Sequence, residues 1–184
     1  MINLNLAAGT WKPEGWISVD IRSRDGVLLV MDLSSVFPIK SNSIGAIFCS
    51  HFLEHLSLKD GLVFLKECYR ILLPNGKIRV SVPDFKLLVS KYLEGKWDGV
   101  EEEIPAGNRS ILEVLNCETF YPYVEPPEKS HNAQYDEELL CKVMNDAGFQ
   151  DIVRSNFRKS KWEEFRVVGL DNRPKHSLFM EGVK

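Results

Sequence analysis

The 184-residue sequence predicts an α/β fold with a mostly parallel sheet, and three observations carry this prediction. Residues 44–49 form a short apolar run, which is the pattern of a strand buried on both faces. Residues 58–73 then place apolar side chains at helical intervals, and residues 77–82 alternate apolar with polar side chains as a strand does. A strand, a helix and a second strand in this order are typical of parallel strands joined by a crossover helix.

Three further strands are expected upstream, over residues 2–6, 16–21 and 27–31, because each is a short run of strand-forming side chains. The first run breaks into two alanines, a glycine and a threonine at positions 7–10. Small residues at a strand end let the backbone approach a ligand closely, although a plain tight turn accounts for them equally well. The end of the first strand is therefore a candidate contact for a ligand.

Two aspartates stand at the ends of the next two strands. Asp20 lies near the end of the second, and Asp32 directly follows the third. Acidic side chains at strand ends accept hydrogen bonds from ribose hydroxyls or an exocyclic amine. Each aspartate alone would be explained as a helix cap or a turn residue. Two of them at matching strand ends favour a nucleotide-like site.

The turn Pro74-Asn75-Gly76 is expected to end the helix that begins at residue 58, because proline cannot continue a helix. The remaining chain predicts two more helices and two closing strands, over residues 85–93, 135–147, 149–157 and 176–183. Glycines, prolines and an acidic run interrupt any period in residues 94–132, within which only residues 110–115 resemble a short helix. We interpret residues 1–184 as a single domain with a substrate lid or binding insertion at 95–132. The charged stretch 158–175 is interpreted as a solvated loop.

Composition excludes several classes of function. The net charge of −3 offers no basic surface for a phosphate backbone, so we expect no nucleic-acid partner. The four cysteines, at positions 49, 68, 117 and 141, are scattered, which argues against a disulfide framework and a zinc knuckle. No apolar segment approaches the length that spans a bilayer, and the N-terminal residues read as a strand rather than a signal peptide. We expect a cytoplasmic protein without a membrane partner; its oligomeric state is not readable.

The most informative stretch follows the apolar strand 44–49 and reads Ser50-His-Phe-Leu-Glu-His55. Two histidines and a glutamate therefore sit just past the carboxyl end of a buried strand. Open α/β sheets bind their ligands in that position. Apolar side chains from residue 52 onward begin helical spacing, so a helix is expected to start there.

These motifs, in this order, resemble those of class I S-adenosylmethionine-dependent methyltransferases. The matching stretches are Leu4–Gly9 for the glycine-rich first motif, Gly15–Asp20, Asp32-Leu33, Phe37-Pro38, Ser50–His55, Glu67–Gly76 and Lys77–Asp84. The resemblance is good over the first half of the chain and rests on the order of the elements in the second. Asn5, Ala7 and Ala8 stand where the family usually has an acid and glycines. The short spacing from Gly9 to Asp20 leaves little room for a helix between the first two strands.

The resemblance implies a Rossmann-like three-layer sandwich with a mostly parallel seven-stranded sheet and an antiparallel last strand. It also implies S-adenosylmethionine as cofactor and a small molecule as methyl acceptor. The expected cofactor contacts are Ala7, Ala8, Gly9, Asp20, Ile21, Asp32, Leu33, Ser50 and His51. The candidate bases for a hydroxyl or amine acceptor are His51, His55, Asp84 and His131, chosen by position alone. No metal ligand is expected, and the acceptor is not readable from the sequence.

Three alternatives remain open. His51-Phe-Leu-Glu54-His55 matches the H-x-x-E-H motif of inverted zinc peptidases, but that motif needs the middle of a helix and a further carboxylate ligand. A binding or regulatory protein that has kept the fold and lost catalysis is favoured by the altered first motif. A nucleotide-dependent oxidoreductase is disfavoured, because no G-x-G-x-x-G follows the first strand.

Overall fold

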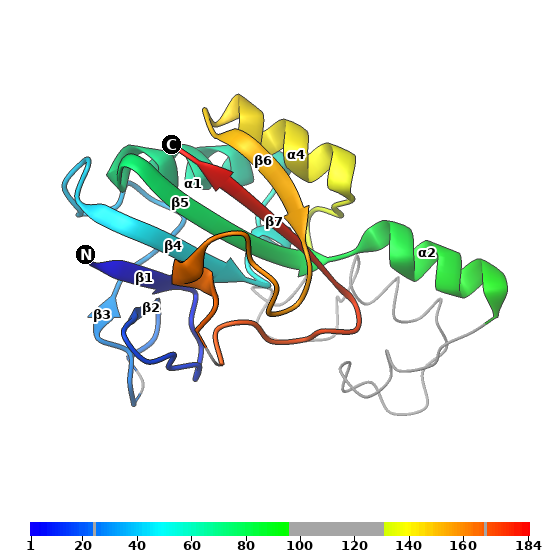
Figure 1. Ribbon diagram of the computed structural model, residues 1–184, viewed down its shortest axis with the longest axis horizontal. Coiled ribbons are helices and arrows are strands. Elements are labelled where there is room, and N and C mark those ends of the chain that lie inside the picture. The colour runs from blue at the N-terminus through cyan, green and yellow to red at the C-terminus, as the bar shows by residue number, and fades with distance from the viewer. Residues whose placement is uncertain (24, 96–130, 168) are drawn as a thin grey trace.

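A computed structural model of the chain describes residues 1–23, 25–95, 131–167 and 169–184. Its centre is a seven-stranded sheet in the order β3-β2-β1-β4-β5-β7-β6 (Figure 1). The strands are β1 (Asn3–Leu6), β2 (Ile17–Asp20), β3 (Leu29–Val30), β4 (Ile44–Ser50), β5 (Leu72–Pro83), β6 (Gln150–Ser155) and β7 (Ser177–Val183). The pairs among β1 to β5 are parallel, and β7 pairs antiparallel with both β5 and β6. The predicted fold class, with its antiparallel last strand, is confirmed.

The described helices are α1 (Leu58–Ile71), α2 (Phe85–Glu94) and α4 (Glu137–Asp146), with the 3₁₀ turns η1 (Leu53–His55) and η3 (Glu163–Phe165). The three predicted α-helices are confirmed within a few residues at each end. The helix expected from residue 52 is wrong, because only the three-residue turn η1 forms there before α1 begins at its Ser57 cap. The Pro74-Asn75-Gly76 turn lies within β5, where it accompanies a shift in the pairing with β4.

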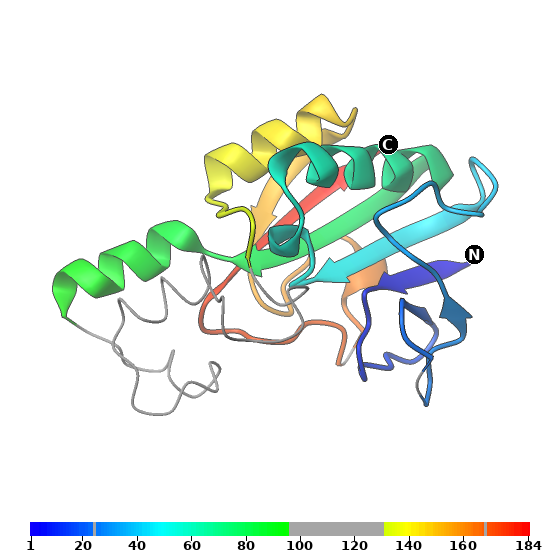
Figure 2. The ribbon, with the colours of Figure 1, turned by 180° about the vertical axis from the view of Figure 1, so that it is seen from behind.

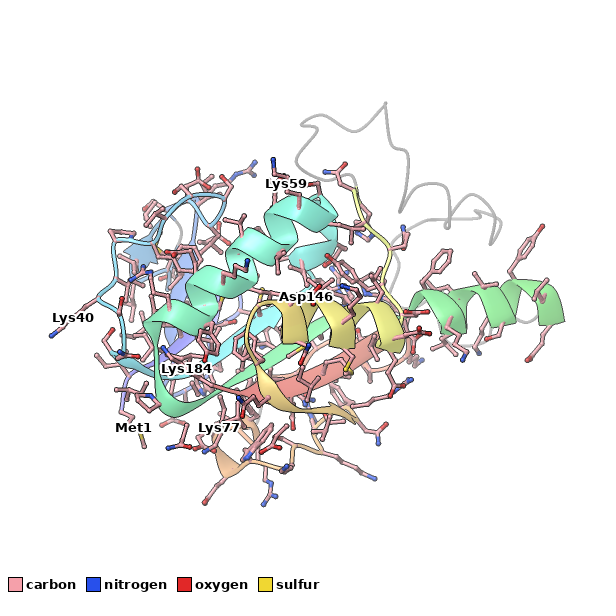
Figure 3. The ribbon with its side chains drawn as sticks, turned by 90° about the horizontal axis from the view of Figure 1, so that it is seen from above. Met1, Lys40, Lys59, Lys77, Asp146 and Lys184 are labelled. Atoms are coloured by element: carbon pink, nitrogen blue, oxygen red, sulfur yellow. The ribbon has the colours of Figure 1, made fainter. Side chains whose placement is uncertain are left out.

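Helices α1 and α4 lie side by side on one face of the sheet, whereas α2 extends away from the sheet edge (Figures 2 and 3). The strand side chains on this face are apolar at alternate positions and form the main core with the two helices. They include Leu4, Leu6, Ile47, Cys49, Ile78 and Val80, with Leu65, Cys68, Leu140 and Met144 from the helices. The intervening side chains of β4, Ala46 and Phe48, are buried in a separate cluster, and burial on both faces is why this strand reads as a nearly continuous apolar run in the sequence.

The opposite face is covered by an irregular segment between β6 and β7, residues 156–176 (Figure 1). Phe165 and Leu170 from this segment pack on Trp16 and Phe48 and form a second apolar cluster. The prediction that residues 158–175 are a solvated loop is therefore wrong. The many charged residues of this segment predict exposure to solvent, but the segment also contains two buried apolar side chains, Phe165 and Leu170.

A buried ionic network ties the same segment to the sheet. The guanidinium of Arg79 on β5 donates two hydrogen bonds to Asp171, of 2.7 and 2.6 Å, and one to Glu181 on β7. All three side chains are almost fully buried. Arg79 also donates to the backbone oxygen of Asn156 and lies 4.7 Å from the centre of the Phe179 ring. The network thus fixes both ends of the covering segment.

The connection from β1 to β2 contains no helix, as the short spacing predicted. Residues 7–16 fold as successive turns, which are held by Ala8 N–H donating to the Val19 oxygen. Asn5 and Ser18, which project from β1 and β2, both donate to the Trp11 oxygen. The result is a compact loop at the carboxyl ends of these strands, without a covering helix.

Strands β1 and β4 are neighbours at the point where the strand order reverses, because β2 and β3 extend to one side of β1 and β4 lies on the other. Open α/β sheets bind ligands in the crevice at this point, beyond the carboxyl ends of the strands. Ala7 and His51 directly follow these two strands, and both have positive φ angles, of 53° and 51°. Such a conformation costs about 1–3 kcal/mol for a residue other than glycine and is concentrated at functional sites.

The predicted lid at 95–132 lies almost wholly outside the described residues, as does the predicted short helix at 110–115. Of the described cysteines, Cys49 and Cys68 are buried free thiols and Cys141 is a partly buried one. Among the described residues, no helix has both the length and the apolar character needed to cross a membrane.

Candidate functional site

A cavity of about 490 Å³ opens at the carboxyl ends of β1, β2 and β3. This volume falls within the range of about 300–1,000 Å³ that is usual for small-molecule sites. Its walls combine two aspartates with apolar side chains. The lining residues are Ala7, Asp20, Ile21, Arg22, Asp32, Leu33, Ser34, Phe52, His55 and Leu56. A larger depression of about 870 Å³ between α4, β6 and the start of α2 is lined mainly by charged and polar side chains and does not reach these strand ends.

Asp20 joins the loops after β1 and β2. One carboxylate oxygen accepts a hydrogen bond of 2.8 Å from Gly9 N–H, and the other accepts one of 3.0 Å from Arg22 N–H. The side chain is 9% exposed and lines the cavity. Because each carboxylate oxygen can accept two hydrogen bonds, Asp20 retains acceptor capacity for a ligand.

Asp32, which also lines the cavity, stands two residues beyond the end of β3. One of its oxygens accepts two hydrogen bonds from Ser34, of 2.8 Å from the backbone N–H and 2.7 Å from the hydroxyl. These hydrogen bonds, the backbone one foremost, hold the pKa of Asp32 below its usual value. The side chain therefore presents a charged oxygen at the rim, beside the buried Leu33.

The loop that carries Asp32 and Leu33 is held by α1. Arg70 donates to the backbone oxygens of Phe37 and Ile39, while the Glu67 carboxylate accepts from Phe37 N–H and from Arg70. The Glu67-x-x-Arg70 pair of the sequence motif is thus a clamp on the connection between β3 and β4. Because this connection also carries Asp32 and Leu33, the pair helps to hold the cavity wall without lining it.

Close backbone approach is possible beside β1. A methyl group at the Cβ position of Gly9 would have no heavy atom within 4 Å, so this backbone faces open space. Gly9 also has a positive φ of 57°, which glycine adopts without strain. Ala7 lines the cavity, whereas the predicted contacts Ala8 and Gly9 are not among its lining residues, so the open backbone at Gly9 lies outside the cavity wall.

Five of the nine expected cofactor contacts line the cavity, namely Ala7, Asp20, Ile21, Asp32 and Leu33. The side chains of Ser50 and His51 are engaged elsewhere. Ser50 donates to Asn172 and accepts from Ser81, so it contacts the covering segment. The His51 ring lies 2.7 Å from the Ser177 hydroxyl and packs edge-on against His176. Neither side chain lines the cavity.

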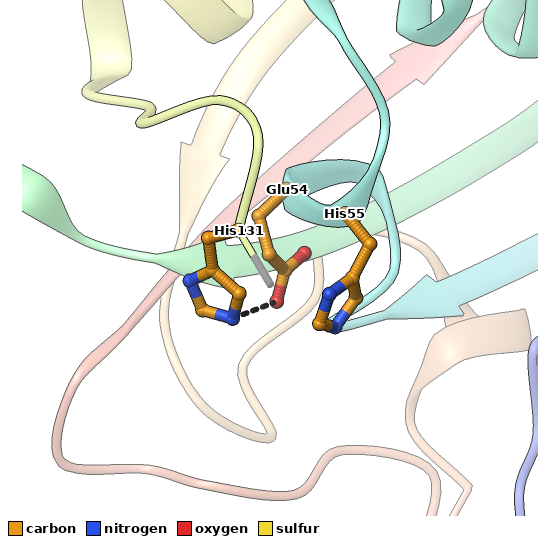
Figure 4. A group of neighbouring side chains, drawn as sticks. All are labelled: Glu54, His55 and His131. Atoms are coloured by element: carbon orange, nitrogen blue, oxygen red, sulfur yellow. Dashed lines mark ion pairs between the residues drawn. The ribbon is translucent and has the colours of Figure 1, made fainter. Parts of the chain in front are cut away.

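Three of the four candidate bases gather around one buried carboxylate. Glu54 is 1% exposed, and its Oε1 lies 3.2 Å from His51 Nδ1 and 4.0 Å from His131 Nε2. The His55 and His131 rings stand edge to face, with their centres 4.8 Å apart (Figure 4). We call Glu54, His51, His55 and His131 the histidine–glutamate cluster; His55 also lines the cavity.

The electrostatics of this cluster centre on Glu54. Burial alone raises the pKa of Glu54, but its close contact with His51 and the neighbouring imidazoles of His131 and His55 outweigh that effect and lower the pKa to about 2. Glu54 is therefore a buried carboxylate anion. Such a charge is stable only when cationic or hydrogen-bonding groups surround it.

The backbone of η1 positions His131, which is far away in the sequence. Asn132 N–H and Ala133 N–H both donate to the backbone oxygen of Glu54, at 2.7 and 3.1 Å. The Asn132 side chain donates to the backbone oxygen of His55 at 2.7 Å. Three hydrogen bonds thus attach the segment before α4 to the turn after β4.

Asp84, the fourth candidate base, occupies a structural position. One oxygen accepts from Leu87 N–H as the cap of α2, and the other accepts from Arg154 at 2.9 Å. Asp84 stays a candidate from the sequence, but both of its oxygens are occupied within the fold.

The H-x-x-E-H motif does not lie on an α-helix. His51 precedes η1 with a positive φ, whereas Glu54 and His55 belong to that three-residue turn. His51 and His55 therefore do not present one helical face, which the inverted zinc-peptidase arrangement requires. This geometry does not support the peptidase alternative.

Sequence reasoning missed Arg22, Ser34, Phe52 and Leu56 as cavity residues. Phe52 and Leu56 follow a strand exit as His51 does, so the strand-end argument could have included them. Their spacing instead predicts the start of a helix. Arg22 and Ser34 carry no signal beyond their proximity to the two aspartates.

Comparisons with known proteins agree with this geometry. A family model described as a methyltransferase domain matches residues 13–80, which begin after β1 and end within β5. A methyltransferase from Thermotoga maritima, described as a possible histamine N-methyltransferase, is 19% identical with a TM-score of 0.59; the match covers 100% of this chain and 82% of that one. No curated protein matches the sequence.

Two other solved structures share the fold. An S-adenosylmethionine-dependent methyltransferase from Archaeoglobus fulgidus is 15% identical, with a TM-score of 0.56 and coverage of 99% of this chain and 85% of that one. The magnesium protoporphyrin IX methyltransferase from Synechocystis, solved with bound SAH, is 12% identical with a TM-score of 0.56 and coverage of 100% and 74%. At these identities the solved structures establish the fold, and the match over residues 13–80 confirms the resemblance read from the motifs.

Proposed function

We propose that this chain, which has the fold of the class I S-adenosylmethionine-dependent methyltransferases, binds S-adenosylmethionine in the cavity described above and transfers its methyl group to a small molecule. The observation that carries the proposal is that Asp20 and Asp32 line one cavity, at the carboxyl ends of adjacent parallel strands. Catalysis by this chemistry depends mainly on positioning, because no covalent bond to the enzyme is needed.

The residues present fit this cofactor. Asp20 has acceptor capacity for the ribose hydroxyls, and Asp32 with Leu33 offers a charged oxygen beside an apolar surface for adenine. The main chain at Gly9, two residues beyond the lining residue Ala7, offers open space for the amino-acid portion. The altered first motif therefore retains the feature that matters physically, which is close backbone access.

Bound S-adenosylmethionine supplies an electrophilic methyl group on a sulfonium. A hydroxyl or amine acceptor must lose a proton during transfer, and an imidazole can take it. His55 is the cluster histidine that lines the cavity, and the Glu54 carboxylate lies beside it. We therefore assign His55 as the first candidate base. His51 and His131 rank after it, because they do not line the cavity.

A small-molecule acceptor is favoured by two observations. The net charge of −3 gives no broad basic surface for nucleic acid. Two of the structurally similar proteins are described by names that imply small acceptors, histamine and magnesium protoporphyrin IX. The location of the chain in the cytoplasm stays a prediction.

A non-catalytic binding protein is the second candidate. It is favoured by Asn5, Ala7 and Ala8 in the first motif and by the engagement of Ser50 and His51 away from the cavity. The two candidates differ in one result. Cofactor binding without methyl transfer to any member of an acceptor library would support the binding protein.

Replacing Ile21 with alanine is expected to raise the Kd for S-adenosylmethionine about 5- to 10-fold, because it removes about 1–1.5 kcal/mol of apolar contact from the cavity wall. Ile21 is 60% exposed, so the fold should not be affected. Leu28→Ala is the matched control, since Leu28 is 73% exposed and does not line the cavity. Calorimetric titration of both variants checks this. An equal loss of affinity in both variants, or no loss in either, would contradict the placement of Ile21 in the cofactor site.

A further inference from the structure

We propose that Glu54, His55 and His131 form a binding site for one divalent transition-metal ion beside the cofactor cavity. One carboxylate oxygen and two imidazole nitrogens, one from each residue, lie within 4.8 Å of one another. Figure 4 shows the three side chains converging from η1 and from the segment before α4. Two histidines and one carboxylate are a ligand set that zinc takes in proteins, with a fourth position left open.

Glu54 provides an independent indication that a cation belongs here. Its side chain is 2% exposed, and within the described part of the chain Oε2 has no hydrogen-bond partner, while Oε1 has ion-pair contacts of 3.2 Å with His51 Nδ1 and 4.0 Å with His131 Nε2. Buried carboxylates in folded proteins almost always accept hydrogen bonds or bind metals. A metal ion would satisfy both the charge and the lone pairs of this one.

The distances are compatible with coordination after a small contraction. Bonds of about 2.1 Å in a tetrahedral arrangement place ligand atoms about 3.4 Å apart, so the widest pair must close by about 1.4 Å. The edge-to-face arrangement of His55 and His131 lets small side-chain rotations supply this movement.

The backbone also pre-organises the site. Hydrogen bonds from Asn132 and Ala133 to the backbone oxygens of Glu54 and His55 hold the two ligand-bearing segments together independently of any ion. His51, whose Nδ1 faces Glu54, is placed to orient the ligating carboxylate, a supporting contact that metal sites commonly have. A ligand set spread over 77 residues of sequence is thereby assembled in the fold.

The site extends the proposed function and rests on it in one respect, namely the identity of what fills the open position. His55 belongs both to the ligand set and to the cavity wall, so the open position adjoins the cavity. Water or an oxygen of the methyl acceptor is the ligand that suits it. A His55 imidazole bound to the ion has no free lone pair, so in the metal-bound site His55 is a ligand and not the base, and the ion would instead ease the loss of the acceptor's proton by lowering the pKa of the bound hydroxyl. An acceptor with a hydroxyl or carboxylate oxygen is therefore the substrate class that this geometry favours.

The test is calorimetric titration of the metal-stripped protein with Zn²⁺ alone. We expect one ion per chain. The association constant for Zn²⁺ should fall by about 100-fold or more in both Glu54→Gln and His131→Asn, since each removes a ligand. Glu137→Gln, which removes an exposed carboxylate from α4, is the matched control and should bind Zn²⁺ as the native chain does. Circular dichroism of each variant confirms that it is folded.

A second readout does not depend on the variants. Co²⁺ added to the native protein should give visible absorption bands of a site with nitrogen and oxygen ligands, and Zn²⁺ should abolish them. No binding of Zn²⁺, or binding that both ligand variants retain, would overturn the proposal. Titration of the same metal-free samples with S-adenosylmethionine separates the two claims, because failure there with intact Zn²⁺ binding removes the proposed function and leaves the metal site.

Discussion

Replacing Arg79 with methionine is expected to lower the free energy of unfolding by about 3–5 kcal/mol. Arg79 is fully buried and is the cation that faces Asp171 and Glu181, which are themselves 2% and 0% exposed. Removing it leaves two carboxylates in the interior without their cationic partner, and burying an uncompensated charge is among the most costly changes in a protein. Methionine keeps most of the side-chain volume, so the loss reports charge rather than packing.

Chemical denaturation followed by circular dichroism measures this loss. Arg166→Met is the matched control, because Arg166 is exposed and donates only to backbone oxygens. It should cost less than about 1 kcal/mol. Combining Arg79→Met with Asp171→Asn and Glu181→Gln should recover part of the stability. A loss in Arg79→Met no larger than in Arg166→Met would show that the covering segment is not held by this network.

Replacing Asp20 with alanine is expected to weaken S-adenosylmethionine binding by at least about 100-fold, or about 2.7 kcal/mol. Hydrogen bonds to a charged acceptor contribute about 1.5–3 kcal/mol each, and Asp20 is positioned to accept from the ribose. Its carboxylate also joins the loops after β1 and β2 through Gly9 N–H and Arg22 N–H, so the cavity loses part of its wall as well. Titration calorimetry measures the effect.

Asp25→Ala is the control for this variant. Asp25 lies in the loop after β2 and pairs with Lys12 at the surface, but it does not line the cavity. Its replacement should leave the affinity within about twofold of the native value. Unchanged affinity in a folded Asp20→Ala variant would remove Asp20 from the cofactor site.

Local patterns in the sequence were sufficient to locate the sheet and one wall of the cavity. Asp20 ends one short run of strand-forming side chains, Asp32 and Leu33 follow another, and the carboxyl ends of parallel strands meet at one edge of the sheet. The missing helix between β1 and β2 was also readable, because ten residues connect these strands. These features depend on neighbours in sequence.

The directions of Ser50 and His51 could not be read from the sequence. Ser50 donates to Asn172 and His51 lies against Ser177, partners that are 122 and 126 residues away. Nothing in the local pattern distinguishes a side chain that faces a cavity from one that faces such a partner. The strand exit was placed correctly, but the side-chain partners there were not.

The covering segment escaped prediction for a related physical reason. Its many charges predict exposure to solvent, yet Asp171 pairs with Arg79 over a separation of 92 residues and Phe165 packs against Phe48 of β4. Charged residues are almost never fully buried unless they are paired, and such pairing is set by the tertiary fold. Glu54 and His131 meet in the same way, across 77 residues.

The central claim is that the cavity binds S-adenosylmethionine. Titration of the purified native chain with S-adenosylmethionine, with S-adenosylhomocysteine and with NAD as control tests it most directly. The structure predicts saturable binding of the first two at one site per chain and no binding of NAD, since no G-x-G-x-x-G loop follows β1. Absence of binding by either sulfur compound would contradict the claim, and would mean that this fold serves another ligand.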